Sequence, residues 1–334
     1  MKKIKVLIVD DSTLMREALR HIFEQDPDIE VVGAAKDGRE GVEKARKLKP
    51  SVITMDLRMP VMSGLEAIES IMEESPIPVI VVSSMDTEVI VKALSMGAMD
   101  FVAVTNDIDT IASDLLMKVK VASRVRALRR YKVKPYSIKA PKISKNTNLS
   151  KIIAVGVSTG GPQALQEVFS KLEPTFAAGI LVVQHMSKGF IEGLAEWLNA
   201  TSCLHIQVAK AGDALRDGLI MLAPDNYHTR IDENGLIVLS ENTDKSILHV
   251  PSIDAMMRST AESFKEDAIG LIMTGMGTDG VEGIKAIKKF GGVTLAQDEK
   301  TSVVFGMNKA AIESGSVDRV AALERIAAEL KGML

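Results

Sequence analysis

Hydrophobic residues in the first third of the chain form short apolar runs that alternate with amphipathic stretches. Largely apolar segments of strand length cover residues 5–9, 30–34, 52–55, 78–82 and 99–102. Apolar residues spaced three and four positions apart, as on one face of a helix, cover residues 14–24, 38–47, 64–74, 88–96 and 108–129. Five strand–helix units of this kind predict one parallel, doubly wound sheet of five strands.

A second α/β pattern begins at Ile152. Buried strands are predicted at residues 152–155, 180–183, 268–273 and 292–296, with helical segments between them. Four shorter runs are broken by Asp-Gly and Asn-Gly pairs and cover residues 205–208, 219–222, 229–232 and 236–239. The pair Asn234-Gly235 is a strong signal for a β-hairpin. The pattern predicts a mostly parallel, doubly wound α/β domain with an antiparallel hairpin insertion.

A basic segment separates the two patterns. It contains nine cationic residues, which are Arg124, Arg126, Arg129, Arg130, Lys132, Lys134, Lys139, Lys142 and Lys145. Apolar periodicity is lost over residues 133–148, which favours a flexible linker. A nucleic-acid contact is the alternative, but Tyr131 and Tyr136 are the segment's aromatic residues, so a solvated linker is favoured. The predicted organisation is a domain over 1–123, a linker over 124–148 and a domain over 149–334.

Composition narrows the class of protein. The chain has 334 residues, of which 46% are hydrophobic and 25% charged, as in a soluble globular protein with two domains. The net charge of −3 implies no general attraction to nucleic acid or to a membrane. No apolar run approaches the ~20 residues of a membrane helix, so membrane insertion is not expected. The single cysteine, Cys203, excludes an internal disulfide and fits a cytoplasmic protein.

Carboxylates follow two of the predicted strands in the first domain. Asp10 and Asp11 end the first strand, and Asp56 ends the third. The carboxyl ends of neighbouring parallel strands meet in one crevice, where such acids repel one another unless a cation is present. Mg²⁺ is the natural cation there, and a carboxylate beside it can attack a phosphoryl group. Each acid alone could be a helix cap or a solvated loop residue; the two strand ends together favour a metal site.

Residues 3–123 resemble the response-regulator receiver family. The matching segments are Val9-Asp10-Asp11-Ser12, Met55-Asp56-Leu57-Arg58-Met59-Pro60, Gly64, Val82-Ser83-Ser84 and Gly97-Ala98-Met99-Asp100-Phe101-Val102. The resemblance implies that Asp56 is the phosphoacceptor, that Asp10, Asp11 and Asp56 hold Mg²⁺, and that a histidine kinase is the phosphodonor. It also implies that Ser83 and Phe101 are switch residues.

One departure from the receiver pattern is large. Receivers carry Lys-Pro shortly after the Asp-Phe pair, and the lysine contacts the phosphoryl group, whereas this chain has Val104-Thr105. The next lysine is Lys118, inside the last predicted helix of the domain. We therefore expect slow phosphorylation and weak coupling to conformation.

The segment from Gly156 to Gly161 contains a G-x-S-x-G motif. It follows the predicted strand at 152–155, and Pro162 opens a helical pattern. A serine on such a strand-to-helix turn exposes its hydroxyl for attack on a carbonyl, and N–H groups at the helix start can stabilise an oxyanion. A plain Gly-Ser turn or a phosphate-binding loop is the alternative. Ser158 is the candidate nucleophile.

A base for Ser158 must come from few residues. The chain's histidines are His21, His185, His205, His228 and His249. His185 follows the predicted strand at 180–183 and so lies at the same sheet edge as Ser158; His228 is the second choice. Asp279 lies in a glycine-rich loop after another buried strand and is the candidate orienting acid. Catalytic triads occur in different chain orders on unrelated folds.

Residues 149–333 resemble the catalytic domain of the chemotaxis protein-glutamate methylesterases. The matching segments are Gly156-Val157-Ser158-Thr159-Gly160-Gly161, Gln184-His185-Met186, His249-Val250-Pro251-Ser252-Ile253-Asp254, Met273-Thr274-Gly275-Met276-Gly277-Thr278-Asp279-Gly280 and Ala296-Gln297-Asp298-Glu299 through Gly306-Met307. The resemblance implies Ser158 as nucleophile, His185 as base, Asp279 as orienter, and Thr159 and Met276 beside the oxyanion. Asn308 stands where a proline is usual.

Receiver, linker and esterase occur in the order of the full-length enzymes of that family. The resemblance therefore implies a phosphorylation-regulated serine esterase that hydrolyses glutamyl methyl esters on methylated chemoreceptors. Deamidation of receptor glutamines would use the same chemistry, and ester hydrolysis would need no cofactor. The alternative is a signalling or docking module whose esterase domain binds a partner without turnover.

Overall fold

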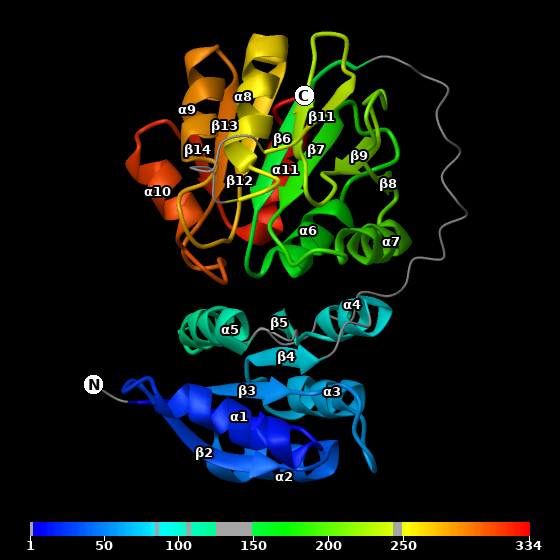
Figure 1. Cartoon of the computed structure of the whole chain (residues 1–334). Coiled ribbons are helices and arrows are strands. Elements are labelled where there is room, and N and C mark those ends of the chain that lie inside the picture. The colour runs from blue at the N-terminus through cyan, green and yellow to red at the C-terminus, as the bar shows by residue number, and fades with distance from the viewer. Residues whose placement is uncertain (1–2, 84–86, 105–107, 125–148, 243–248) are drawn as a thin grey trace. The chain divides into compact units, whose positions relative to one another are not determined.

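The computed structural model describes residues 3–83, 87–104, 108–124, 149–242 and 249–334. The chain divides into two compact units, Met1–Lys132 and Val133–Leu334, coloured from blue to cyan and from green to red in Figure 1. Apart from Arg124, the predicted linker lies outside the described residues. Across the described ranges, no helix is both long and apolar enough to cross a membrane.

The N-terminal unit is a five-stranded parallel sheet, which confirms the prediction, and its strand order is β2-β1-β3-β4-β5. The strands are β1 (Ile4–Val9), β2 (Ile29–Ala35), β3 (Val52–Met55), β4 (Val79–Ser83) and β5 (Asp100–Ala103). The helices are α1 (Thr13–Glu24), α2 (Gly38–Leu48), α3 (Gly64–Glu74), α4 (Thr87–Ser95) and α5 (Ile108–Ala122). Helix α5 ends at Ala122, earlier than the predicted residue 129.

Helices cover the sheet of the N-terminal unit on both sides. Helices α1 and α5 contact one another, while α2 contacts α3 and α3 contacts α4 (Figure 1). Consecutive residues Val6, Leu7 and Ile8 of β1 are all fully buried, which is typical of a parallel strand covered on both faces. The chain runs from β1 to β2 on one side and from β3 to β4 and β5 on the other. The strand order therefore reverses between β1 and β3, where Asp10 and Asp56 follow their strands.

The C-terminal unit has a seven-stranded parallel sheet of order β14-β13-β12-β6-β7-β9-β8. Its strands are β6 (Ile152–Val157), β7 (Gly179–Gln184), β8 (His205–Val208), β9 (Leu219–Leu222), β12 (Ala268–Ile272), β13 (Val293–Gln297) and β14 (Arg319–Ala321). Its helices are α6 (Gly161–Phe169), α7 (Ile191–Thr201), α8 (Ile253–Phe264), α9 (Val281–Lys289), α10 (Met307–Glu313) and α11 (Leu323–Lys331). The predicted mostly parallel fold is confirmed.

The antiparallel insertion is a two-stranded hairpin of β10 (His228–Ile231) and β11 (Ile237–Ser240). Ile231 pairs with Ile237 across the turn that contains Asn234 and Gly235, and Gly235 has a φ of 77°, as the hairpin signal requires. The other two short runs, β8 and β9, join the main parallel sheet instead.

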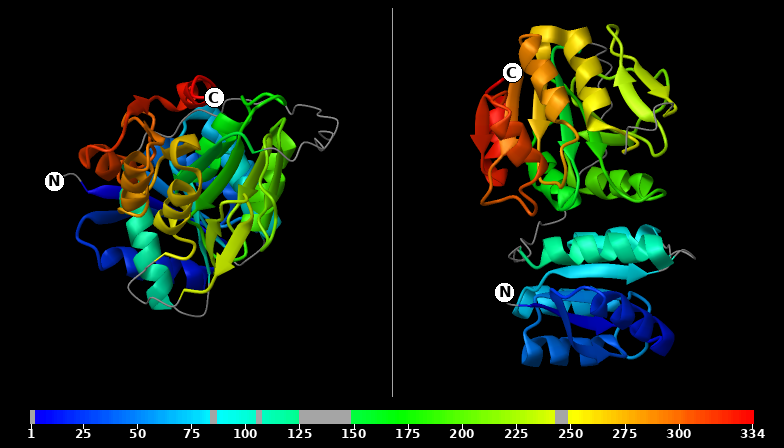
Figure 2. Two further views of the ribbon diagram at one scale, coloured as in Figure 1. Left: turned by 90° about the horizontal axis from the view of Figure 1, so that it is seen from above. Right: turned by 60° about the vertical axis from the view of Figure 1, so that its left-hand side comes forward.

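Two hydrophobic clusters lie on opposite faces of the larger sheet. Ile153 and Val155 of β6 face α6, α7 and α11, while Ile152 and Ala154 face α8, α9 and α10 (Figure 2). Because both faces are covered, β6 reads as a continuous apolar run. The strand order reverses between β6 and β12. Ligands bind at such reversals in open α/β sheets, so the loops after β6 and β12 mark the expected site.

Candidate active site and acidic pocket

Ser158 lies on the tight turn between β6 and α6. The Gly161 N–H donates to the Ser158 carbonyl oxygen at 2.8 Å, and the Ser158 N–H donates to the Thr274 carbonyl oxygen, just beyond β12, at 3.0 Å. The left-handed conformation of this turn falls on Gly160, whose φ is 77°, and not on Ser158. Ser158 is therefore fixed at the strand-order reversal with its side chain partly exposed.

His185 follows β7 directly and lies beside the Ser158 turn. Its N–H donates to the Val157 carbonyl oxygen at 2.9 Å, which extends the pairing of β6 and β7. Its Nε2 lies 3.0 Å from Asp279 Oδ2. Its Nδ1 is buried and has no hydrogen-bond partner among the described residues. The imidazole ring therefore makes no hydrogen bond with Ser158 in this structure. Asp279 thus holds a proton on Nε2, which leaves Nδ1 as the nitrogen able to accept a proton.

Asp279 is held at the N-terminus of α8. Its Oδ1 accepts from Ser252 Oγ at 3.0 Å and from the Asp254 N–H at 2.9 Å, and its Oδ2 accepts from the Ile253 N–H at 2.8 Å and from His185. Burial alone raises the pKa of Asp279, but these hydrogen bonds outweigh burial and lower the pKa to about 2. Asp279 is therefore ionised at neutral pH and its two oxygens are fully committed.

Gln184 ties the turn of Ser158 to the strand of His185. Its Nε2 donates to the Ser158 carbonyl oxygen at 2.9 Å and to the His185 carbonyl oxygen at 2.7 Å, and the residue is 3% exposed. A Cβ on Gly161 would lie 2.0 Å from Gln184 Oε1, so the position of this amide explains why residue 161 is a glycine. The sequence analysis included Gln184 in a matching segment but gave it no role. The signal that could have revealed the role is a polar residue at the end of an apolar strand, directly before the candidate base.

Two other histidines border the candidate site. His228, the second choice for a base, is buried, and its Nδ1 accepts from the N–H of Ser252, the N-cap of α8, at 3.2 Å. It therefore supports the helix that holds Asp279. His249, which the sequence left without a role, stacks on His185 with ring centroids 4.4 Å apart. Burial and the neighbouring His185 lower the pKa of His249, which favours a neutral ring there.

The loop after β12 packs closely against Ser158. A Cβ on Gly275 would lie 2.8 Å from Ser158 Cβ, so only glycine allows this approach. Thr274 Oγ1 donates to the Thr159 carbonyl oxygen at 2.9 Å, while the side chain of Met276 is 46% exposed. Within the described part of the chain, the backbone N–H groups of Thr159 and Met276 have no hydrogen-bond acceptor. The two predicted oxyanion neighbours thus flank Ser158 from two loops.

Asn308, which replaces the usual proline, has a defined place at the start of α10. It is fully buried, and its Nδ2 donates to the Gln297 carbonyl oxygen at 3.0 Å and to Ser302 Oγ at 2.6 Å. Gln297 Oε1 in turn accepts from the Thr274 N–H at 2.9 Å. Through Gln297, the asparagine is therefore linked by hydrogen bonds to the loop that contacts Ser158.

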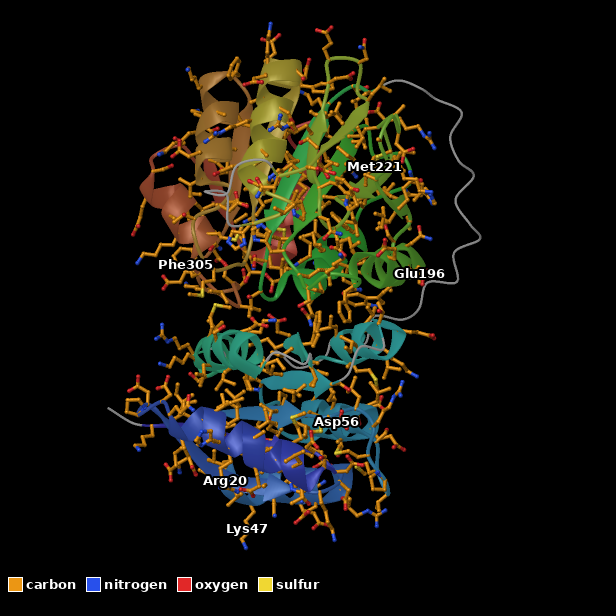
Figure 3. All side chains as sticks on the ribbon, viewed as in Figure 1. Arg20, Lys47, Asp56, Glu196, Met221 and Phe305 are labelled. Carbon is orange, nitrogen blue, oxygen red and sulfur yellow. The ribbon has the colours of Figure 1, made fainter. Side chains whose placement is uncertain are left out.

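The acidic residues of the N-terminal unit gather at the ends of β1 and β3. Asp56, labelled in Figure 3, follows β3 and its Oδ1 accepts from Ser83 Oγ at 2.9 Å. Burial, with the charges of Asp56 and Asp11, raises the pKa of Asp10 to about 6. Burial, with the charge of Asp11, also raises the pKa of Asp56. Phe101, the second predicted switch residue, is buried in β5.

The raised pKa values of Asp10 and Asp56 reflect burial and mutual repulsion of carboxylates, a charge arrangement that suits a cation. The described residues nevertheless contain no group of three His, Cys, Asp or Glu side chains arranged to hold a metal ion. Mg²⁺ binds through one or two carboxylates and keeps water and phosphate ligands, so a closed protein cage is not required. The carboxylates fit such an open site.

No lysine reaches this pocket from the expected position. Val104 is partly buried, and its N–H donates to the Ser83 carbonyl oxygen at 3.0 Å. Lys118 is engaged elsewhere: its Nζ lies 3.3 Å from Asp100 Oδ1 and 3.1 Å from Asp114 Oδ2, and it donates to the Phe101 carbonyl oxygen. Lys118 therefore does not replace the missing cation.

Asp10→Asn is expected to raise the free energy of unfolding of the N-terminal unit at pH 7, by about 3 kcal/mol. The pKa of Asp10 is about 6 in the folded chain and 3.8 in the unfolded chain, so folding favours the protonated form. That stabilisation is complete below pH 3.8 and is lost as the pH rises through 6. Asparagine keeps an acceptor for the Ser12 N–H without the charge.

Hydrogen exchange of peptides from the N-terminal unit, in the full chain, measures this change in the free energy of unfolding. The gain from Asp10→Asn should shrink towards pH 4. Asp28→Asn, at an exposed acid of the same unit, is the control. A gain of equal size at pH 4 and pH 7 would contradict the assigned pKa.

Comparisons with known proteins match this architecture. The CheB methylesterase family model matches residues 153–330, and the response regulator receiver domain model matches residues 6–116. The chain is 41% identical over 338 residues to the protein-glutamate methylesterase/protein-glutamine glutaminase of Pyrococcus horikoshii, with 97% of this chain and 92% of that protein covered. The protein of the same name from Lawsonia intracellularis is 39% identical over 355 residues, with 99% of each covered.

A solved structure agrees with the C-terminal unit. The crystal structure of the Thermotoga maritima CheB methylesterase catalytic domain aligns with a TM-score of 0.54 and 36% identity. The alignment covers 56% of this chain and 100% of that one. Since the family model spans more than half of the chain and the relatives cover nearly all of it, the chain belongs to the CheB methylesterase family, with a response regulator receiver domain before the esterase domain.

Proposed function

We propose that this chain hydrolyses glutamyl methyl esters on chemoreceptors and that Ser158, His185 and Asp279 carry the reaction. The observation that carries the proposal is the hydrogen bond of His185 Nε2 with Asp279 Oδ2 at 3.0 Å, at the same strand-order reversal as Ser158. A domain that only bound its partner would have no need of a buried, ionised acid that orients an imidazole. The names of the relatives support the substrate class.

The chemistry follows from the state of each group. Ser158 Oγ attacks the ester carbonyl carbon while His185 Nδ1 takes the hydroxyl proton, and Asp279 stabilises the imidazolium that forms. The N–H groups of Thr159 and Met276 are the candidate donors to the oxyanion. The carbon–oxygen bond to the methoxy group then breaks, and methanol leaves with the proton from Nδ1.

Deacylation returns the enzyme to its starting state. Water gives a proton to His185 Nδ1 and adds to the acyl carbon, after which Ser158 Oγ leaves and recovers a proton. The product is a glutamate side chain. If the substrate is a glutamine side chain, the first leaving group is ammonia instead of methanol, and the outcome is deamidation.

The receiver domain supports regulation by phosphorylation of Asp56, with a histidine kinase as phosphodonor. The Ser83 hydroxyl that donates to Asp56 Oδ1 is available to the phosphoryl group once it is attached. Asp10, Asp11 and Asp56 would hold Mg²⁺, which neutralises charge on the transferring phosphoryl group when it is bound. Because Val104 replaces the lysine, a charge-assisted hydrogen bond to the phosphoryl oxygens is missing, which weakens the switch.

Methanol release from a methylated receptor fragment tests the proposal, with and without a small phosphodonor. Wild type should release methanol, with a small increase in rate on phosphorylation. Val104→Lys should enlarge that increase several-fold, and Asp56→Asn should abolish it. Lys36→Ala, at an exposed position of the same domain, is the control. Val102→Lys would not serve, because Val102 is buried.

The arms of this experiment have separate meanings. No methanol release by folded wild type would overturn the esterase proposal and favour a docking module. A large increase in wild type that depends on Asp56 would contradict the weak switch. No response to the phosphodonor in any variant would contradict regulation through Asp56.

A further inference from the structure

We propose that Asp254 is a positioning residue for the His185–Asp279 pair. The inference rests on the proposed catalytic roles of those two residues, and it concerns an acid that touches neither the serine nor the imidazole. Asp254 lies in the first turn of α8, and Asp279 lies in the loop before α9. Each acid accepts hydrogen bonds from the N-terminus of the other's helix.

The two sets of hydrogen bonds are reciprocal. Asp279 accepts from the N–H groups of Ile253 and Asp254 at the start of α8. Asp254 Oδ1 accepts from the Gly280 N–H at 2.9 Å and from the Gly283 N–H at 2.7 Å, at the start of α9. Helix N-termini have unpaired N–H groups and partial positive charge, so each carboxylate satisfies donors that would otherwise be buried without a partner.

The bond to Gly280 restrains Asp279 directly. The N–H of Gly280 belongs to the peptide group that follows Asp279, so Asp254 Oδ1 fixes the backbone next to the Cα of the orienting acid. Gly280 has a φ of 100°, and a Cβ there would lie 2.5 Å from Ile272 Cδ1 and 2.8 Å from Ile253 Cγ2. The loop is thus closely packed between α8 and β12, and Asp254 holds it by accepting the hydrogen bond from Gly280.

The charges around Asp254 show why its carboxylate needs the N–H groups at the start of α9. Burial and the negative charge of Asp279 raise the pKa of Asp254, whereas the two N–H bonds and the exposed Arg258 act in the opposite direction. Two neighbouring carboxylates would repel one another if either lost its helix N-terminus. The reciprocal bonds hold them at a fixed separation, and so hold Asp279 Oδ2 towards His185 Nε2.

Both bonds to Asp254 end on the same oxygen, which makes the test specific. Asparagine retains one acceptor oxygen in the same place, whereas glutamate retains the charge but moves its oxygens by one methylene group. In the full chain, Asp254→Asn should keep kcat within about threefold of wild type. Asp254→Glu and Asp254→Ala should each lower kcat by roughly 10- to 100-fold, with KM little changed, because misaligned catalytic groups slow the chemical step.

A spectroscopic readout separates positioning from general loss of stability. The far-downfield proton resonance of the His185 Nε2–H···Asp279 hydrogen bond should persist in Asp254→Asn and be lost or broadened in Asp254→Glu. Asp318→Ala is the matched control, since Asp318 Oδ2 accepts from the Thr294 N–H at 3.0 Å in the same domain. That control should lower the thermal stability and leave both kcat and the resonance unchanged.

Several results would overturn the proposal. If folded Asp254→Glu keeps the kcat and the resonance of wild type, or if Asp254→Asn loses both, position of the oxygen is not what matters. If Asp254→Ala does not fold, the Asn and Glu variants still decide. If wild type itself has no esterase activity, the proposed function fails, but the resonance in the three variants still tests whether Asp254 positions Asp279.

Discussion

Replacing Ser158 with alanine is expected to lower the rate of ester hydrolysis by about 10³-fold or more, with the protein still folded. In the proposed mechanism, this hydroxyl forms the acyl intermediate. The turn that carries it is held by backbone bonds: Ser158 N–H to the Thr274 carbonyl, and Gly161 N–H to the Ser158 carbonyl. Alanine leaves both bonds in place, so the loss belongs to the chemistry and not to the fold.

Methanol release gives the rate, and the fluorescence of the single tryptophan, Trp197 of α7, gives the stability of the same domain. Ser170→Ala is the control, because Ser170 is the C-cap of α6 and its hydroxyl donates to the Glu167 carbonyl oxygen. It should keep the wild-type rate. If Ser158→Ala retains a tenth of the wild-type rate, another residue is the nucleophile.

Asp279→Asn is expected to lower the rate by roughly 10²- to 10⁴-fold. All four bonds to the carboxylate come from donors, so an NH₂ group faces a donor in either orientation. In the Oδ2 position it opposes the Ile253 N–H and donates to His185 Nε2, which moves the imidazole proton to Nδ1 and removes the base. In the Oδ1 position it opposes the Asp254 N–H, and the imidazolium loses its negative partner.

The same substitution should destabilise the C-terminal domain by about 2 kcal/mol at neutral pH. The pKa of Asp279 is about 2 in the folded chain against 3.8 in the unfolded chain. The stability it contributes is therefore present above pH 3.8 and is lost as the pH falls towards 2. Asp213→Asn, in a turn where Oδ2 accepts from the Lys210 N–H, is the control for both readouts. A wild-type rate in Asp279→Asn would refute the orienting role.

Much of the fold could be predicted because strands buried on both faces leave a plain signal. The run at 152–155 is apolar at every position and the run at 52–55 at every position except Thr54, and the structure places both inside parallel sheets. The hairpin at Asn234-Gly235 was predictable because that pair fits a turn with positive φ. The runs at 205–208 and 219–222 were ambiguous, because short strands do not reveal their partners; they pair in parallel with each other.

The location of the candidate site in the sheet could be predicted because it depends on strand ends. Ser158, His185 and Asp279 each follow a strand, and parallel strands bring their carboxyl ends together. The sequence did not reveal which imidazole nitrogen faces the acid, since that depends on side-chain rotation. It also did not reveal the roles of Asp254 or Gln184, each of which makes a hydrogen bond to a backbone atom 26 residues away in the chain.

The amide of Gln184 has a consequence for how this sequence can change. Its Oε1 lies where a side chain at position 161 would begin, and its Nε2 holds the carbonyl groups of Ser158 and His185. An alanine at 161 would displace the Gln184 amide, and that displacement would disturb the bonds of Nε2 to the two carbonyl groups. The effect of a substitution at position 161 therefore depends on the residue at position 184, so the two positions are coupled in how the sequence can change.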